Sequence, residues 1–212
     1  MRYIKRFIIT IGLLFPMLTL AAPSEPSFVE GKEYQVIKTA PVDDRKPGEV
    51  KVVEFFSYGC PGCYHFESVL DIWLASKPKN VVFERIPVIF HQGWDVYAKA
   101  YYVANSMGLL AKIHQPLFNA IHQQNQTLAD EQSMADFFAQ HGVNRQDFIN
   151  RYEFMPLIGA QLEKSEKLVQ AYGIYEIPTL VIDGKYRTNI AMVNGDQQRF
   201  FALLNYLIQR KA

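Results

Sequence analysis

Hydrophobic residues in the first half of the chain form two short runs separated by a segment with helical periodicity. Residues 50–56 are β-branched and aromatic almost throughout, which is typical of a central strand covered on both faces. Pro61 suits a first helical turn, and apolar residues then recur at helical spacing until Pro78. Residues 81–86 form the second run, which stops at Pro87. The pattern predicts strand, helix, strand.

From Trp94 to about Tyr172 the apolar positions follow a helical period, and we expect four or five helices there. Asp130 and Asn144 are suited to cap helix N-termini. Gly108 and Gly142 stand where glycines commonly follow a helix C-terminus.

Strand signals outside this helical block lie on both sides of it. Val36 and Ile37 indicate a short strand near the start of the chain. After the block, residues 179–182, the turn pair Asp183-Gly184 and residues 185–187 predict a hairpin, and a last helix should run from about 196 to 209. This order describes one α/β unit with a helical insertion in its middle.

The N-terminus has the features of a secretory signal peptide. Arg2, Lys5 and Arg6 precede an apolar run over residues 7–20, which is shorter than a membrane-spanning helix needs and is interrupted by Pro16. We expect a signal peptide of residues 1–21, with cleavage after Ala22 as a second option. An uncleaved N-terminal anchor is the alternative.

Composition and net charge exclude several classes of partner and site. The chain has 212 residues, and its 22 Lys and Arg against 21 Asp and Glu leave a net charge of +1. No excess of positive charge is available to neutralise a phosphate backbone, so we expect no nucleic-acid partner. The two cysteines, Cys60 and Cys63, are too few for a disulfide framework or a four-thiolate zinc site.

The two cysteines lie three residues apart at the start of the predicted helix. Unpaired backbone N–H groups at that end would stabilise a thiolate on Cys60, so the pair is suited to disulfide exchange. A structural disulfide is one alternative, although closing so short a loop removes little freedom from the unfolded chain. A zinc site is another, but it would need two more ligands. Covalent haem attachment is excluded, because Tyr64 replaces the required histidine.

The chain resembles the family of DsbA-like periplasmic thiol:disulfide oxidoreductases. The resemblance spans most of the mature chain and is carried by Val-Glu-Phe-Phe-Ser at residues 53–57, Cys-Pro-Gly-Cys-Tyr at 60–64, Phe66-Glu67, Gly173-Ile174, Ile177-Pro178 and Asp-Gly-Lys-Tyr at 183–186. It implies an α/β thioredoxin fold with an inserted all-helical domain. The thioredoxin-like domain would comprise residues 28–91 and 173–212, and the helical insertion residues 92–172.

The resemblance also implies roles for site residues. Cys60 would be the nucleophile, Cys63 the more buried resolving thiol, and Pro178 a cis-proline beside them. A trans proline that starts the following strand is the alternative for Pro178. Ile177, Pro61 and Gly62 would contact the client protein. Gly62 stands where the family most often has histidine, so stabilisation of the thiolate by that imidazole is absent.

Three charged residues complete the expected site. By resemblance, Glu54 is a buried proton acceptor near Cys63, and it pairs with a basic residue that aligns to Arg85. The alternative for Glu54 is a water-facing glutamate on an edge strand. Glu67 could join this charged cluster or lie on a solvated helix face.

We expect an exported enzyme that donates its Cys60–Cys63 disulfide to folding proteins and needs no bound cofactor. Its partners would be reduced, unfolded exported proteins and, by resemblance, a membrane oxidase of the DsbB type, and it would act in the periplasm. Two alternatives remain: a disulfide reductase or isomerase of the same fold, and a non-catalytic thiol chaperone or metallochaperone.

Overall fold

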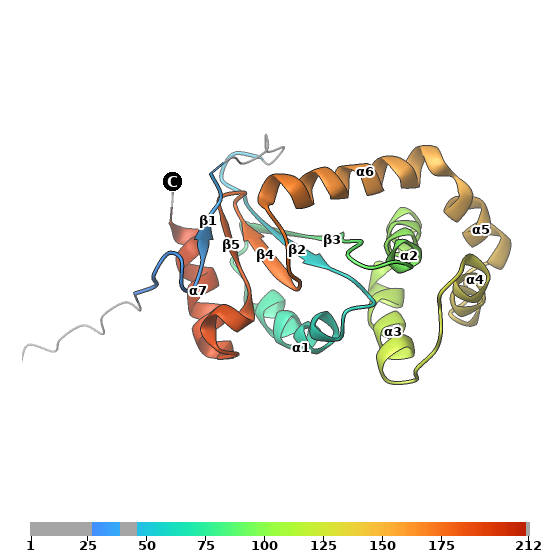
Figure 1. The fold of residues 1–212 in the computed structure, drawn as a ribbon, viewed down its shortest axis with the longest axis horizontal. Coiled ribbons are helices and arrows are strands. Elements are labelled where there is room, and N and C mark those ends of the chain that lie inside the picture. Colours follow the sequence, from blue (N-terminus) through green and yellow to red (C-terminus); the bar gives the residue numbers. More distant parts are fainter. Residues whose placement is uncertain (1–26, 39–45, 211–212) are drawn as a thin grey trace, which may run out of the picture.

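The computed structural model describes residues 27–38 and 46–210, and in this part of the chain a five-stranded sheet forms the centre of one end of the molecule (Figure 1). The strands are β1 (Gln35–Val36), β2 (Val50–Phe56), β3 (Val81–Pro87), β4 (Thr179–Ile182) and β5 (Tyr186–Thr188). Their order across the sheet is β1-β5-β4-β2-β3. The predicted signal peptide lies outside the described residues.

Strand β2 is flanked on both sides, as its apolar run predicted. It pairs parallel to β3 and antiparallel to β4. Because side chains alternate along a strand, its two faces enter different parts of the core. Val52 packs with the helices on one face, whereas Val53 and Phe55 pack on the other.

Helices cover both faces of the sheet. Helix α1 (Pro61–Ser76) and helix α7 (Gln197–Gln209) pack over the face that contains Val52, where Phe66 of α1 contacts Phe200 of α7. The last turns of helix α6 (Met155–Tyr172) pack over the opposite face. Glu54 follows Val52 by two residues, so its side chain is directed to the α1 face.

The inserted block contains five helices, which agrees with the predicted four or five. They are α2 (Trp94–Ser106), α3 (Leu110–His122), α4 (Glu131–Gln140), α5 (Arg145–Glu153) and α6. Asp130 and Asn144 cap α4 and α5 as predicted, and Gly108 and Gly142 have positive φ just after α2 and α4. Helix α6 runs from this block back to the sheet (Figure 1). None of the helices in the described ranges is long and apolar enough to cross a membrane.

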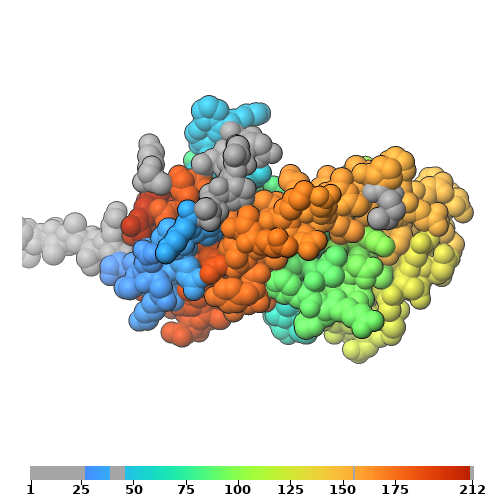
Figure 2. Space-filling model, turned by 45° about the horizontal axis from the view of Figure 1, so that its top comes forward, coloured from blue at the N-terminus to red at the C-terminus, as the bar shows by residue number. Residues whose placement is uncertain are grey.

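The start of the described chain lies against its C-terminal segment (Figure 2). Phe28 packs against Tyr206 of α7, and Arg199 of α7 forms an ion pair with the buried Glu33. These contacts join β1 and the segment before it to the thioredoxin-like part of the fold.

Several predicted boundaries are wrong by one or two residues, because hydrogen bonding rather than side-chain type sets where an element ends. The first strand is Gln35–Val36 instead of residues 36–37, and the hairpin's second strand is Tyr186–Thr188 instead of 185–187. Strand β3 includes Pro87 opposite Phe56. Helix α1 ends at Ser76, and Asp196 caps α7 instead of opening it. A short 3₁₀ helix, Ile190–Val193, was not predicted.

Candidate active site

The two cysteines lie where the chain leaves the central strand and enters a helix. Strand β2 ends at Phe56, and Cys60 is the N-cap residue of α1 with extended backbone angles. Pro61 occupies the first helical position, where its missing N–H costs nothing. The Cys60 sulfur accepts a hydrogen bond from the Cys63 backbone N–H at 3.2 Å, in place of the oxygen that usually caps a helix.

The pair is electrostatically asymmetric. Hydrogen bonding from the Cys63 thiol, supported by the backbone N–H groups of Cys63 and Gly62, lowers the pKa of Cys60 to about 7. Burial raises the pKa of Cys63 far above its usual range, since this side chain has no exposed surface. Cys60 keeps 8% exposure and is followed by the exposed residues Pro61 and Gly62. The arrangement therefore combines a reactive outer thiol with an inner thiol that strongly prefers to be protonated.

The loop before β4 lies next to Cys60. The Ile177–Pro178 peptide bond is cis, as predicted, and the Cys60 thiol donates to the Ile177 carbonyl oxygen at 3.8 Å. A Cβ atom placed on Gly62 would lie 3.7 Å from both the Cys60 sulfur and the Pro178 ring. Gly62, Cys60 and Pro178 therefore share one small surface.

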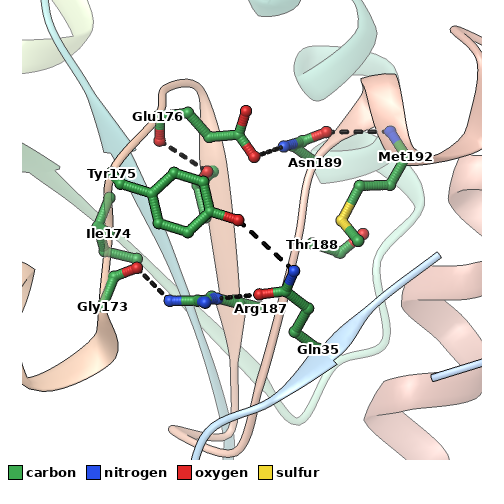
Figure 3. Close-up of a pocket in the computed structure, with 10 residues that line it drawn as sticks. Gln35, Gly173, Ile174, Tyr175, Glu176, Arg187, Thr188, Asn189 and Met192 are labelled. Carbon is green, nitrogen blue, oxygen red and sulfur yellow. Dashed lines mark hydrogen bonds between the residues drawn. The ribbon is translucent and has the colours of Figure 1, made fainter. Parts of the chain in front are cut away.

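Polar side chains form hydrogen bonds to this loop and to the segment before it, around the small pocket drawn in Figure 3. Arg187 donates to the carbonyl oxygens of Tyr172 and Gly173 at the end of α6. Asn189 donates to the Glu176 carboxylate at 2.8 Å, and the Thr179 hydroxyl donates to the Glu176 carbonyl oxygen at 2.8 Å. These contacts connect the Ile177–Pro178 loop to the sheet.

Glu54, Arg85 and Glu67 form a single cluster beneath the cysteines. Arg85 donates from Nε to Glu54 at 2.9 Å and from Nη2 to Glu67 at 3.0 Å. Glu54 is fully buried on a central strand and Glu67 is 2% exposed, so neither carboxylate faces water. Burial raises the pKa of Glu54 to about 8 against the opposing effect of Arg85, and the negative charge of Glu67 adds to this rise. The cluster can hold a proton near neutral pH.

Two residues of this region were not predicted from the sequence, Tyr58 and His114. His114 lies on α3, where its Nε2 atom is 3.1 Å from Glu67 and its Nδ1 atom is 2.8 Å from the Tyr58 hydroxyl. The sequence gives one indication that His114 is buried, which is its position next to the apolar residues Ile113, Leu117 and Phe118 of α3. That signal does not identify its partners, which lie far away in the sequence.

The described residues offer no metal centre. Among them, no group of three or more His, Cys, Asp or Glu side chains could hold a metal ion. His65, next to the cysteine pair, is exposed. The chemistry available at this site is that of two thiols and a buried, protonatable carboxylate.

Comparison with known proteins identifies the relatives of this chain. The family model for the DSBA-like thioredoxin domain matches residues 93–207, which begins after the cysteine pair. A thiol:disulfide interchange protein DsbA from Pseudomonas aeruginosa is 36% identical over 207 residues, covering 98% of this chain and 97% of the relative. The chain belongs to the DsbA family. The DsbA of Burkholderia cepacia is 34% identical and covers 92% of this chain and 90% of the relative.

Solved structures of the DsbA family agree in fold. The crystal structure of Pseudomonas aeruginosa DsbA has a TM-score of 0.79 at 37% identity, covering 86% of this chain and 94% of the other. The DsbA oxidoreductase of Xylella fastidiosa has a TM-score of 0.76 at 28% identity, covering 86% and 96%. The protein is a thiol:disulfide oxidoreductase that donates disulfides, built on a thioredoxin fold with an inserted helical domain.

Proposed function

We propose that Cys60 is the sulfur attacked by client proteins and that Cys63 is the leaving thiol. The observation that carries this assignment is the position of the Cys60 sulfur at the N-cap of α1, where it accepts the Cys63 N–H at 3.2 Å while Cys63 lies fully buried behind it. A client thiolate can reach the outer sulfur only. The lowered pKa of Cys60 makes it the better leaving group in the second step.

The reaction consists of two exchanges. A client thiolate attacks the Cys60 sulfur, a mixed disulfide forms, and the electron pair of the Cys60–Cys63 bond passes to Cys63. Cys63 then takes a proton. A second client thiolate attacks the client sulfur of the mixed disulfide, and Cys60 leaves as a thiolate. The client has been oxidised to a disulfide, and the enzyme has been reduced to a dithiol.

Glu54 is the proposed source of the proton that Cys63 takes. It holds a proton near neutral pH because it is buried and because Arg85 is shared with Glu67. Arg85 and Glu67 are thus supporting residues that set the charge around Glu54. Once Glu54 has given up its proton, its negative charge raises the pKa of Cys63, which keeps the proton on the sulfur.

Ile177, Pro178, Pro61 and Gly62 form the proposed client-binding surface. An extended client segment beside Cys60 could pair with the backbone of Ile177, while Pro178 has no N–H that would compete for the sulfur. The exposed Pro61 and Gly62 leave the approach to Cys60 open, because neither carries a large side chain.

We further propose that residues 1–21 direct export and that the mature protein acts in the periplasm on reduced, unfolded exported proteins. A membrane oxidase of the DsbB type would restore the disulfide. We assign residues 28–91 and 173–212 to the thioredoxin-like domain and residues 92–172 to the insertion, since α2–α6 lie between β3 and β4.

Trapping experiments test the roles of the two cysteines. In Cys63→Ser, a mixed disulfide between Cys60 and client proteins should accumulate, because no resolving thiol remains. In the matched variant Cys60→Ser none should form. If Cys60→Ser traps clients and Cys63→Ser does not, the assignment is wrong.

Equilibration with glutathione buffers tests the direction of transfer. A disulfide donor must be reduced readily by the buffer. A difference of about 30 mV in reduction potential corresponds to about 1.4 kcal/mol between the disulfide and dithiol forms. If the protein is a disulfide donor, its oxidised form, which carries the Cys60–Cys63 disulfide, should form a disulfide in a reduced client without any other oxidant. A pair that stays oxidised in strongly reducing buffer would indicate a reductase or isomerase, and a pair that transfers nothing would indicate a thiol chaperone.

A further inference from the structure

Five polar side chains from five segments of the chain form one continuous line of hydrogen bonds. The Tyr58 hydroxyl is 2.8 Å from His114 Nδ1, and His114 Nε2 is 3.1 Å from Glu67 Oε2. Glu67 Oε2 also accepts from Arg85 at 3.0 Å, and Arg85 continues to Glu54 at 2.9 Å. His114 therefore connects the charged cluster to the helical insertion, and Tyr58 contacts His114 from the loop after β2.

The direction of each hydrogen bond can be assigned. Glu67 Oε2 accepts from Arg85 and also faces His114 Nε2, so Nε2 carries the proton that it donates to this carboxylate oxygen. Burial lowers the pKa of His114, which keeps the ring neutral, so Nδ1 carries no proton and accepts. Burial raises the pKa of Tyr58 well above its usual range, so its hydroxyl keeps the proton that it donates to Nδ1.

A cavity of about 380 Å³ lies against this line on its outer side. Exposed residues Asp71, Ala111 and Gln115 form its mouth, and Glu67, Arg85 and His114 lie along its wall. The second carboxylate oxygens of Glu54 and Glu67, both named Oε1, are buried and have no hydrogen-bond partner among the described residues. The orientation of Glu67 is consequently set only by the two donors on its other oxygen, Arg85 and His114.

We propose that His114 is a positioning residue of the redox centre, held by Tyr58 in the tautomer that anchors Glu67 on Arg85. This inference rests on the role proposed for Glu54. With Glu67 anchored, one guanidinium serves two carboxylates, and Glu54 keeps the proton that Cys63 takes. Without the imidazole donor, Glu67 keeps one of its two hydrogen bonds and no longer fixes Arg85 in place, so the guanidinium can turn towards Glu54, whose pKa it lowers. Glu54 then loses its proton at a lower pH.

The charged groups around His114 come from every element packed against it. Glu67 and Asp71 belong to α1, Arg85 to β3, and Tyr58 to the loop after β2. On α2, Tyr101 donates to the Arg85 carbonyl oxygen at 3.1 Å and lines the same cavity. Burial raises the pKa of Tyr101 well above its usual range, so this hydroxyl stays neutral. Among the described residues of the helical insertion, the His114 imidazole alone donates to Glu67.

The test is the pH profile of disulfide transfer in a single turnover, with one reduced peptide as client. The rate constant of each variant is divided by that of the parent at the same pH, which cancels ionisation of the peptide thiol. For His114→Leu, which removes the donor, this ratio should fall with rising pH, corresponding to a shift of the alkaline limb by about half a pH unit or more. His114→Gln keeps an N–H donor near the position of Nε2 and should retain the parent profile.

His141→Gln is the matched control. His141 is a half-buried histidine on the helical insertion that contacts the Phe137 carbonyl oxygen at 2.8 Å, away from the cluster. Its ratio should stay flat. A flat ratio for His114→Leu overturns the inference, and so does an equal shift in His114→Gln or in His141→Gln.

Two further measurements keep the test decisive if His114→Leu folds poorly. Nitrogen NMR of the parent should show the His114 ring protonated at Nε2, and a ring protonated at Nδ1 would overturn the inference. Tyr58→Phe should shift the profile in the same direction as His114→Leu. If Glu54→Gln leaves the parent profile unchanged, the role proposed for Glu54 fails. If Glu54→Gln changes it and His114→Leu does not, only the present inference fails.

Discussion

Glu54 and Arg85 lie directly opposite each other on the parallel strands β2 and β3, and Arg85 Nε donates to Glu54 Oε2 across 2.9 Å. Thirty-one positions separate the two residues along the chain. The strand register thus places a cation beside a fully buried carboxylate, on the same face of the sheet as α1. Because Arg85 also contacts Glu67, its charge is divided between two acids.

The raised pKa of Glu54 should make the protein less stable as the pH rises. Burial raises this pKa from 4.5 to about 8, so the folded protein keeps a proton that the unfolded chain releases. Such a contribution is fully present below the unfolded pKa and is lost as the pH rises through the folded pKa. Between about pH 6.5 and pH 8, the free energy of unfolding should fall by about 2 kcal/mol in denaturant melts.

This measurement needs the disulfide-bonded form. In the dithiol form the lowered pKa of Cys60 contributes stability that rises with pH and opposes the effect of Glu54. Starting near pH 6.5 also leaves out most of the pH range in which His114, whose pKa is lowered from 6.5 by burial, contributes. Glu54→Gln keeps an oxygen acceptor for Arg85 and should flatten the slope. An equally steep slope in Glu54→Gln would contradict the prediction.

Gly62→His should make the protein more oxidising. A Cβ at Gly62 meets the Cys60 sulfur and the Pro178 ring at 3.7 Å, which is ordinary van der Waals contact, so a side chain fits. An imidazole there adds a donor beside the Cys60 thiolate and should lower the pKa of Cys60 below about 7. The ultraviolet absorbance of the thiolate against pH measures the change. Gly62→Ala adds a side chain without a donor, and an equal shift in that variant would show that the imidazole is not the cause.

Gly59→Ala should disturb the packing between the active-site loop and α2. A Cβ at Gly59 would lie 2.5 Å from Trp94 Nε1 and 3.0 Å from a ring carbon of Tyr97, so Trp94 must move. We expect a cost of about 1–3 kcal/mol and slower disulfide transfer, because this loop leads directly into Cys60. Tryptophan fluorescence should change, since Trp94 gains exposure. Unchanged fluorescence and thermal stability would contradict the prediction.

Phe118→Ala should destabilise the protein strongly. Phe118 has no exposed surface. The centroid of its ring lies 4.8 Å from the ring centroid of Tyr58 and 6.0 Å from those of Phe56 and Tyr64. Phe118 therefore connects α3 to residues that precede Cys60 and to Tyr64, which follows Cys63. Deleting this ring should cost about 3–5 kcal/mol in denaturant melts.

Phe154→Ala is the control for Phe118. The Phe154 side chain is 56% exposed, so its removal should change the free energy of unfolding by no more than about 0.5 kcal/mol. Equal losses in the two variants would show that burial of Phe118 is not the source of the effect.

The sequence by itself determined the elements that depend on near neighbours. The apolar run of β2, the periodicity of α1 and the caps Asp130 and Asn144 all express contacts within a few residues, and they predicted their elements closely. The two cysteines could be recognised for the same reason, because Pro61 between them and the helical periodicity that follows place both at one helix N-terminus.

Only the tertiary structure decided which distant side chains meet. The pairing of Arg85 with Glu54 was expected only by resemblance to a family, and it is the register of β2 and β3 that places the two residues opposite each other. The packing of α3 on α1 brings His114 to Glu67, which was not expected. The insertion also places Trp94 against Gly59. No spacing along the chain encodes these pairs, since each depends on how whole helices and strands dock. The charge around the buried carboxylates is therefore a property of the assembled fold, whereas the reactive pair is already visible in the order of the residues.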